Sequence, residues 1–213
     1  EQLISDTSID LIACAAIPSD RAELALRALD AGKDFFTAKP PLTSLEQLDA
    51  VQRQVAKTGR KFAVYFNERI NVDSALFAGE LVQQGEIGRV IQTMGVGPHR
   101  ERGARPDWFY QKHQYGGILC DIGIHQIEQF LYFTGNTDAR VVTSQTANYH
   151  HPHHPEFEDF GDAMLLGDNG ATGYFRCDWF TPDGLSVWGD GRLTILGTEG
   201  YIEIRNNVDI TRR

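Results

Sequence analysis

The sequence predicts two units, an α/β layer with a parallel sheet and a following α+β unit with an open, mostly antiparallel sheet. Strand-like apolar runs alternate with helical patterns over residues 1–67, and such alternation calls for right-handed crossovers between parallel strands. The alternation of strand and helix patterns ends after Asn67, and from Ala139 onward short strand-like segments follow one another. Turn signals such as Gly167-Asp168-Asn169-Gly170 separate these segments, which is typical of a meander. We therefore expect units over residues 1–67 and 68–213.

The first unit begins with a near-continuous apolar run over residues 9–17, which predicts a strand covered on both faces. A helix over residues 20–29 follows, with Ser19 or Asp20 as its N-cap and Gly32 just beyond its end. The remaining elements expected here are a strand over 34–38, a helix over 44–58 that starts with the capping-box pattern Ser44-Leu45-Glu46-Gln47, and a strand over 61–66.

The second unit is expected to start with mixed elements and to end in strands. Helical spacing predicts helices over residues 72–84 and 115–133, the second closed by Gly135, with a strand over 89–96 between them. The strands expected after these elements cover residues 140–149, 159–166, 171–180, 192–196 and 201–204.

Composition excludes several classes of protein. The formal net charge is -9 and no run of lysine and arginine interrupts this acidity, so nucleic acid is not an expected partner. No apolar run approaches the ~20 residues that cross a bilayer, and no targeting signal is visible, so no membrane partner is expected. The cysteines Cys14, Cys120 and Cys177 lie far apart without C-x-x-C spacing. Reduced thiols and a cytoplasmic protein are the expectation.

Two short motifs bring chemistry to this framework. Asp121 and His125 are four residues apart in a helical pattern, so their side chains should project from one face. Lys39 follows the strand over residues 34–38 and is held at its carboxyl end by Pro40. A lysine, an aspartate and a histidine are the groups that removing a proton from an alcohol requires.

These motifs, in this order, resemble those of the Gfo/Idh/MocA oxidoreductases, a family named after glucose-fructose oxidoreductase, inositol dehydrogenase and rhizopine catabolism. The matching segments are Ile17-Pro18, Lys39-Pro40, the Gly116-Gly117…Asp121-x-Gly123-x-His125 helix and the Gly197-Thr198-Glu199-Gly200 turn. The resemblance implies an N-terminal Rossmann-type domain for NAD or NADP. It also implies a C-terminal α+β domain whose open sheet supports homo-oligomers, and a sugar, cyclitol or related polyol as substrate.

Two departures from the family pattern shape the expectations. Ala38 stands where the family has a glutamate, so Lys39 lacks that neighbouring carboxylate. The sequence also contains no G-x-G-x-x-G phosphate-binding segment. We therefore expect residues 1–67 to be the second half of a nucleotide-binding domain, a partial Rossmann-type sheet whose 9–17 strand lies at an exposed edge. This segment alone is expected to bind the cofactor weakly or not at all.

Within this resemblance His125 is the expected general base, Asp121 its partner and Lys39 the stabiliser of negative charge on the reacting oxygen. Ile17, Pro18, Lys39, Pro40 and Asn67 are the expected cofactor contacts, since they follow strand ends on one edge of the sheet. Lys39, Trp108, Tyr115, Asp121 and His125 are the expected substrate contacts.

Alternatives stand beside these assignments. A histidine in a helix is commonly a core residue, Asp121 alone would be a solvated or capping carboxylate, and Pro18 and Asn67 alone would be turn residues. Trp108 and Tyr115 would stack on a sugar ring or anchor a loop in the core. Two alternative functions remain for the whole protein. In one it uses its cofactor transiently for elimination or hydrolysis, and in the other it is a catalytically silent scaffold or sensor.

The one compositionally biased segment is the histidine-proline cluster over residues 150–155. Neither cysteine nor a second ligand pair lies at a matching spacing, so no physiological metal site is expected there. The loop over residues 149–160 is instead a candidate substrate lid.

Overall fold

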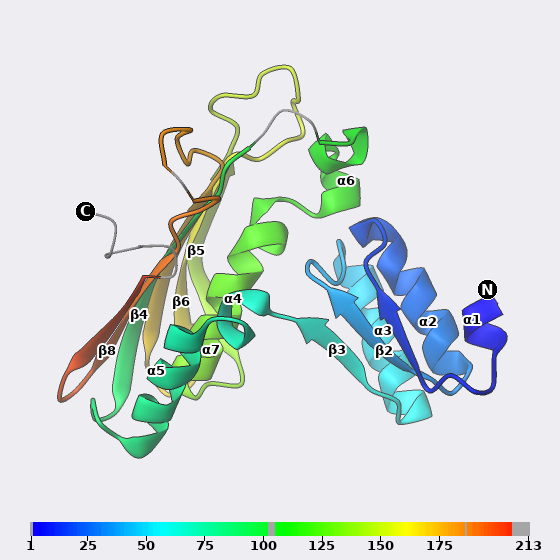
Figure 1. The fold of residues 1–213 in the computed structure, drawn as a ribbon, viewed down its shortest axis with the longest axis horizontal. Coiled ribbons are helices and arrows are strands. Elements are labelled where there is room, and N and C mark those ends of the chain that lie inside the picture. The colour runs from blue at the N-terminus through cyan, green and yellow to red at the C-terminus, as the bar shows by residue number, and fades with distance from the viewer. Residues whose placement is uncertain (1, 102–104, 186, 206–213) are drawn as a thin grey trace.

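The computed structural model describes residues 2–101, 105–185 and 187–205 of the chain. It contains a three-stranded sheet with strand order β1-β2-β3 and a six-stranded sheet with order β5-β6-β7-β4-β8-β9. The two sheets form separate units, and the long helix α7 (Ile124–Thr134) lies on the side of the larger sheet that faces the smaller unit (Figure 1). The fold class predicted from the sequence is confirmed. In the described ranges, no helix has the length and apolar character needed to cross a membrane.

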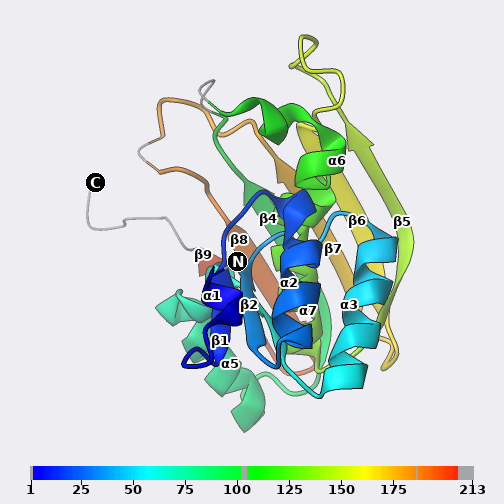
Figure 2. The same ribbon diagram turned by 90° about the vertical axis from the view of Figure 1, so that its right-hand side faces the viewer.

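The smaller unit is a parallel α/β layer. All its strand pairs are parallel, with Leu11 opposite Asp34 and Phe35 opposite Phe62. The helices α2 and α3 lie together on one side of the sheet (Figure 2). Its elements are α1 (Gln2–Ser5), β1 (Leu11–Cys14), the 3-10 turn η1 (Pro18–Asp20), α2 (Arg21–Asp30), β2 (Asp34–Ala38), α3 (Leu45–Thr58) and β3 (Phe62–Tyr65).

Local signals set the ends of α3. The Ser44 side chain accepts a hydrogen bond from the Gln47 backbone N–H at 3.2 Å, and Gly59 ends the helix in the left-handed conformation. The Gln47 side chain accepts from the Thr43 backbone N–H at 2.8 Å, so the capping box is closed one residue earlier than its usual form.

The predicted two-sided burial of the first strand is wrong. β1 covers only Leu11–Cys14, and Leu11 is 51% exposed. β1 forms one edge of the three-stranded sheet, and α2 and α3 cover a single face of that sheet. The run of apolar residues therefore continues past the strand itself, into the segment that leads to η1.

The larger unit is a mixed sheet with helices on one face. Its elements are α4 (Asn67–Ile70), α5 (Asp73–Gln84), β4 (Val90–Pro98), η2 (Asp107–Tyr110), α6 (Lys112–Tyr115), η3 (Leu119–Gly123), α7, β5 (Ala139–Ala147), β6 (Phe160–Gly167), β7 (Thr172–Asp178), β8 (Arg192–Gly197) and β9 (Tyr201–Arg205). β4 pairs in parallel with β7, and every other strand pair of this sheet is antiparallel. The prediction of a simple antiparallel meander is therefore wrong, because β4 is inserted between β7 and β8.

The predicted long helix over residues 115–133 is interrupted. Gly116 and Gly117 both have positive φ, at 90° and 87°, so the chain turns between α6 and the next helical segment. That segment, η3, is a π-helical turn that runs into α7. The buried Glu158 accepts from the Ile118 backbone N–H at 2.9 Å and so satisfies a free donor at the start of the second segment.

Candidate active site

A cavity of about 380 Å³ lies where the two units meet. Residues from both units line it, and the set includes every predicted site residue except Ile17: Pro18, Arg21, Lys39, Pro40, Asn67, Glu68, His99, Arg105, Pro106, Trp108, Phe109, Tyr115, Asp121, His125, Trp179 and Trp188. Ile17 lies one residue away, where its carbonyl accepts from the Asp20 backbone N–H at 2.9 Å. Segments far apart in the sequence thus form one site.

Lys39 and Asp121 form an ion pair across the boundary between the units. The Lys39 Nζ atom lies 2.9 Å from Asp121 Oδ1, and the side chains are only 25% and 12% exposed. Lys39 follows the carboxyl end of β2 and is joined to Pro40 by a cis peptide bond, whereas Asp121 projects from the π-helical turn. The pair therefore holds an ammonium group at a fixed place in the cavity wall.

A buried arginine fixes the backbone on both sides of Lys39. Arg21, the first residue of α2, donates from Nη1 to the carbonyl oxygens of Ala38 at 2.7 Å and Pro40 at 2.6 Å. Its Nε donates to the Ala16 carbonyl at 2.8 Å. Sequence reasoning missed this residue, since an arginine at a helix start carries no distinctive signal.

His125 lies one turn after Asp121 and is almost fully buried, with 2% exposure. Burial, followed by the positive charge of Lys39 and then His99, lowers the pKa of His125 to about 3. The ring therefore stays neutral above that pH, so an imidazole nitrogen without a proton is available as an acceptor. The ring packs edge-on to Phe66, with the centroids 6.1 Å apart. Among the described residues, none hydrogen-bonds its Nδ1 atom.

Glu68 is the main polar residue that sequence reasoning missed. It lies in the short helix α4, with Oε1 4.0 Å from His125 Nε2 and 3.6 Å from His99 Nε2. Gln126 donates to its Oε2 at 3.4 Å. Burial raises the pKa of Glu68 to about 7, although Lys39 opposes the shift. The segment after Asn67 contains no motif, so only the folded chain reveals this carboxyl group.

Aromatic rings form part of the cavity wall. Tyr115 is 1% exposed and its hydroxyl accepts from the Glu158 backbone N–H at 2.9 Å, so this ring also belongs to the core. Trp108 packs edge-on against Phe109, with the ring centroids 5.9 Å apart. The Arg105 guanidinium lies over the Phe109 ring at 4.3 Å. Arg105, Phe109, Trp179 and Trp188 were not predicted as site residues, because no motif marks them in the sequence.

Residues that follow the strand ends of the smaller sheet line one edge of the cavity. Pro18, Pro40 and Asn67 follow β1, β2 and β3 respectively, and all three line the cavity. Open α/β sheets bind dinucleotides at the carboxyl ends of their strands, so these residues fit the nicotinamide end of NAD or NADP. The sequence has no G-x-G-x-x-G segment, so the pyrophosphate has no recognisable loop in this chain.

The histidine-rich loop has its own contacts. His151 Nδ1 lies 2.9 Å from Asp159 Oδ2, and Asp159 is completely buried. The His154 ring stacks on Tyr110 with the centroids 3.7 Å apart. In the part of the chain that the structure describes, no group of three or more His, Cys, Asp or Glu side chains is placed to hold a metal ion.

Two family models match the chain. Residues 1–66 match the model described as "Oxidoreductase family, NAD-binding Rossmann fold". Residues 76–203 match the model described as "GFO/IDH/MocA C-terminal domain". Together the two models cover most of the sequence, and the gap between them contains α4.

Individual relatives agree with these matches. The chain is 30% identical to scyllo-inositol 2-dehydrogenase (NAD(+)) of Bacillus subtilis (strain 168), over 95% of this chain and 57% of the relative. It is 27% identical to D-xylose dehydrogenase of Paenarthrobacter nicotinovorans, over 89% of this chain and 48% of the relative. The chain thus spans about half the length of the curated relatives it matches.

A solved structure is also very similar. The 1.25 Å crystal structure of a protein from Erwinia carotovora atroseptica SCRI1043 is 93% identical in sequence, with a TM-score of 0.97. The match covers 99% of this chain and 63% of the crystallised chain. The arrangement of both units is therefore that of a known fold.

Proposed function

Because the chain belongs to the GFO/IDH/MocA oxidoreductase family, we propose that its full-length gene product oxidises a secondary alcohol of a sugar, cyclitol or related polyol with NAD or NADP. The observation that carries this proposal is the convergence of Lys39, Asp121 and His125 in one cavity. Two relatives are named as dehydrogenases of an inositol and of a pentose, which supports the substrate class.

The three side chains divide the chemistry between them. Oxidation takes a proton from the hydroxyl and a hydride from its carbon, and the nicotinamide of the bound cofactor supplies the hydride acceptor. His125 is neutral near neutral pH, so a ring nitrogen without a proton can accept the hydroxyl proton, and the lowered pKa means that the ring holds this proton only transiently. Lys39 donates a hydrogen bond to the same oxygen and stabilises the negative charge that develops on it. Asp121 holds the Lys39 ammonium group in place.

The other proposed contacts follow from position in the cavity. Pro18, Pro40 and Asn67, with Ile17 beside them, would hold the nicotinamide end of the cofactor together with Lys39. Trp108 and Tyr115 would contact the substrate ring. We also propose the division of the chain into units at Asn67, and a cytoplasmic location, which the free thiols of Cys14, Cys120 and Cys177 support.

The direct test uses the full-length gene product with NAD or NADP and a panel of inositols, aldoses and anhydrosugars. We expect binding of the nucleotide in calorimetry and accumulation of the reduced nicotinamide at 340 nm with at least one polyol. Failure to bind either nucleotide would support a silent scaffold or sensor. Turnover without net reduced nicotinamide would support elimination or hydrolysis through a transient oxidation.

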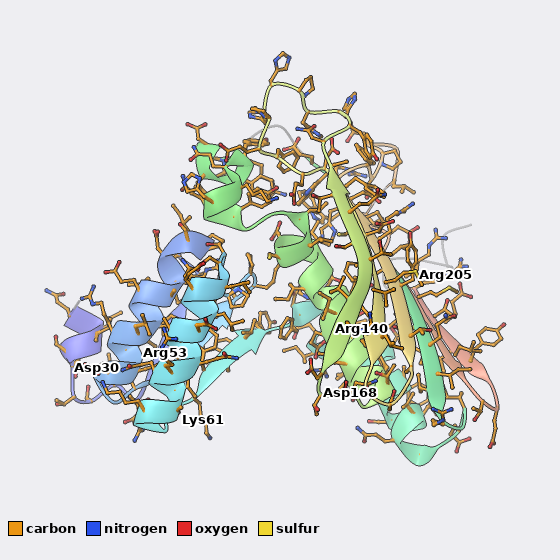
Figure 3. The ribbon with its side chains drawn as sticks, turned by 180° about the vertical axis from the view of Figure 1, so that it is seen from behind. Asp30, Arg53, Lys61, Arg140, Asp168 and Arg205 are labelled. Atoms are coloured by element: carbon orange, nitrogen blue, oxygen red, sulfur yellow. The ribbon has the colours of Figure 1, made fainter. Side chains whose placement is uncertain are left out.

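The larger sheet offers a surface for a second copy of the chain. Met164 is paired with Tyr174, and Tyr174 with Met94, so the three side chains form one row on the face opposite α7. Their exposed fractions are 42%, 38% and 48%. Arg140 and Arg205 lie on the strands at the two edges of this sheet (Figure 3), and Asp162 and Arg176, which are paired across β6 and β7, lie on the same face beside the row. We propose that this face mediates homo-oligomerisation.

Replacing Met94 with lysine tests the oligomer. The change places a charge in the centre of the apolar row, where burial against a second copy would leave that charge without a partner. We expect the full-length gene product to change from an oligomer to a monomer in light scattering. Lys57→Met, on the exposed side of α3, is the control and should leave the mass unchanged. An unchanged mass of the Met94→Lys variant would contradict this interface.

A further inference from the structure

We propose that Glu68 is the proton exit of the site: it receives the substrate's hydroxyl proton from His125 and releases it to water in a second cleft. The inference rests on the proposed alcohol oxidation and adds a residue and a route to it. The geometry of three side chains and two cavities carries it.

The carboxyl group of Glu68 lies beside two imidazole rings. Glu68 Oε1 lies 4.0 Å from Nε2 of His125 and 3.6 Å from Nε2 of His99, so two imidazole rings flank one oxygen atom. A single water molecule or a small side-chain rotation closes such a gap to hydrogen-bond length. The Gln126 side chain donates to the other oxygen, Oε2, at 3.4 Å and limits the orientation of the group.

Glu68 also lies between two cavities. Glu68 lines the cavity of about 380 Å³ that also contains Lys39 and Asp121. It also lines a neighbouring cleft of about 280 Å³, together with Asn71, Pro98 and Gly189. Lys39, Asp121 and His125 line only the first of these two. A nucleotide and a polyol in the first cavity would displace its water, whereas the second cleft would remain open to solvent.

The proton affinities of these groups favour transfer toward Glu68. Burial and the charge of Lys39 lower the pKa of His125 to about 3, so an imidazolium there is a strong acid. Burial also lowers the pKa of His99, so its ring accepts a proton less readily than an exposed imidazole would. Burial raises the pKa of Glu68 to about 7. A proton on His125 is therefore passed downhill to Glu68, which then exchanges with water near neutral pH.

The charged surroundings of Glu68 come from several elements. Lys39 after β2 lowers its pKa, and Asp121 in η3 raises it. His99 after β4 and His125 in α7 approach its Oε1 atom, and Arg192 in β8 lines a narrow gap beside it. Its neighbour Arg69 is paired instead with Glu128, with Nη2 2.5 Å from Oε1. Among these contacts, neither lysine nor arginine forms an ion pair with Glu68 that would keep its carboxyl group ionised.

The proposed route conserves atoms and charge. The O–H bond of the alcohol breaks and its proton joins Nε2 of His125, while the carbon's hydride and its two electrons go to the nicotinamide of NAD(P). The N–H bond on His125 then breaks as a proton joins Oε1 of Glu68. That proton leaves to water in the second cleft and restores the carboxylate.

The test is the pH dependence of kcat/KM for polyol oxidation by the full-length gene product. The proton acceptor must be ionised, so the rate of the unaltered protein should rise with pH through about 7. Glu68→Gln should lower kcat by at least about tenfold, toward the ~10²-fold typical of positioned acid–base groups, and should remove this rise. Glu68→Asp keeps an ionisable carboxyl group and should retain the rise of the rate with pH. Glu80→Gln, on the exposed side of α5, is the matched control and should match the unaltered protein.

A second readout measures the titration of Glu68 without turnover. Its pKa is raised from 4.5 to about 7 on folding, so the stability it contributes is present below about pH 4.5 and is lost as pH rises through about 7. Glutamine cannot ionise. The melting temperature of Glu68→Gln minus that of the unaltered protein should therefore grow between about pH 5 and about pH 8.

The outcomes separate this inference from the proposed function. An unaltered protein that oxidises no polyol would remove the proposed function itself. An active protein whose Glu68→Gln variant keeps both the rate and the pH profile would overturn the proton exit alone. A growing difference in melting temperature with an unchanged rate profile would also overturn it, because Glu68 would then titrate without serving turnover.

Discussion

Replacing His125 with alanine is expected to lower kcat for polyol oxidation by roughly 10²- to 10⁴-fold, the range typical of a positioned general base. Its ring is 2% exposed and lies in the same cavity as Lys39 and Asp121. The substrate's KM should change less than kcat, because proton removal belongs to the chemical step.

The pH dependence of this loss is a sharper expectation. The pKa of His125 is lowered to about 3, so the ring is neutral at every pH at which the protein would be assayed. His125 itself has no ionisation between about pH 6 and about pH 9, so the ratio of the two rates should change over that range only with the ionisation of Glu68 near pH 7. His113→Ala removes an imidazole that is 70% exposed, and it serves as the control with unaltered rates.

Two results would contradict the role of His125. A His125→Ala variant with near-normal turnover would exclude it as the base. A variant that fails to bind the nucleotide, or that melts well below the unaltered protein, would point to a packing role beside Phe66 instead. His125→Asn fills more of the same space and separates these cases, because it restores volume without restoring an acceptor of comparable basicity.

Replacing Lys39 with methionine is the second large effect. We expect kcat/KM to fall by about 10²- to 10³-fold, as when one donor to a developing oxyanion is removed. Methionine keeps most of the side chain's length, so the change removes the ammonium group rather than the contact. It also leaves Asp121, which is 12% exposed, without its partner at 2.9 Å.

The control for Lys39 comes from the same unit of the chain. Lys57→Met removes a lysine–aspartate pair of similar length, 3.2 Å, whose side chains are 68% and 67% exposed. Asp30, its partner, lies on the far side of the smaller unit from the larger sheet (Figure 3). An exposed pair is worth ~0–1 kcal/mol, so Lys57→Met should leave both stability and rate unchanged.

Lys39→Arg distinguishes charge from geometry. Arginine keeps the positive charge but replaces a compact ammonium with a planar, longer group, so it should restore the pairing with Asp121 without restoring the rate. Normal turnover in Lys39→Met would rule out a role for Lys39 in charge stabilisation. Normal turnover in Lys39→Arg alone would show that a positive charge is sufficient there.

This chain lacks the carboxylate that the family has next to the lysine, and contacts with distant residues position Lys39 instead. Ala38 precedes Lys39, and the sequence leaves open what orients the lysine. In the folded chain Asp121 pairs with its ammonium group, and Arg21 binds the carbonyl oxygens on both sides of it. Both partners are distant in sequence, so no local pattern around Lys39 predicts them.

Elements with strong local signals were predicted closely. β2 has the bounds expected from its apolar run, and α3 ends where Gly59 adopts the left-handed conformation. The errors lie where a distant contact decides the backbone. The break at Gly116 and Gly117 depends on Glu158, about forty residues away, and the insertion of β4 beside β7 depends on the pairing of the whole sheet.

The sequence by itself determined the two-unit fold class, most of the elements, and the residue types that point to alcohol oxidation, because periodicity, caps and short motifs act within a few residues. Only the tertiary structure decided that Glu68, His99 and Arg21 join Lys39, Asp121 and His125 around one cavity. It also decided how far the pKa values of His125 and Glu68 move from their usual ranges. A pKa depends on burial and on charges that approach through space, and neither quantity is written in the order of neighbouring residues.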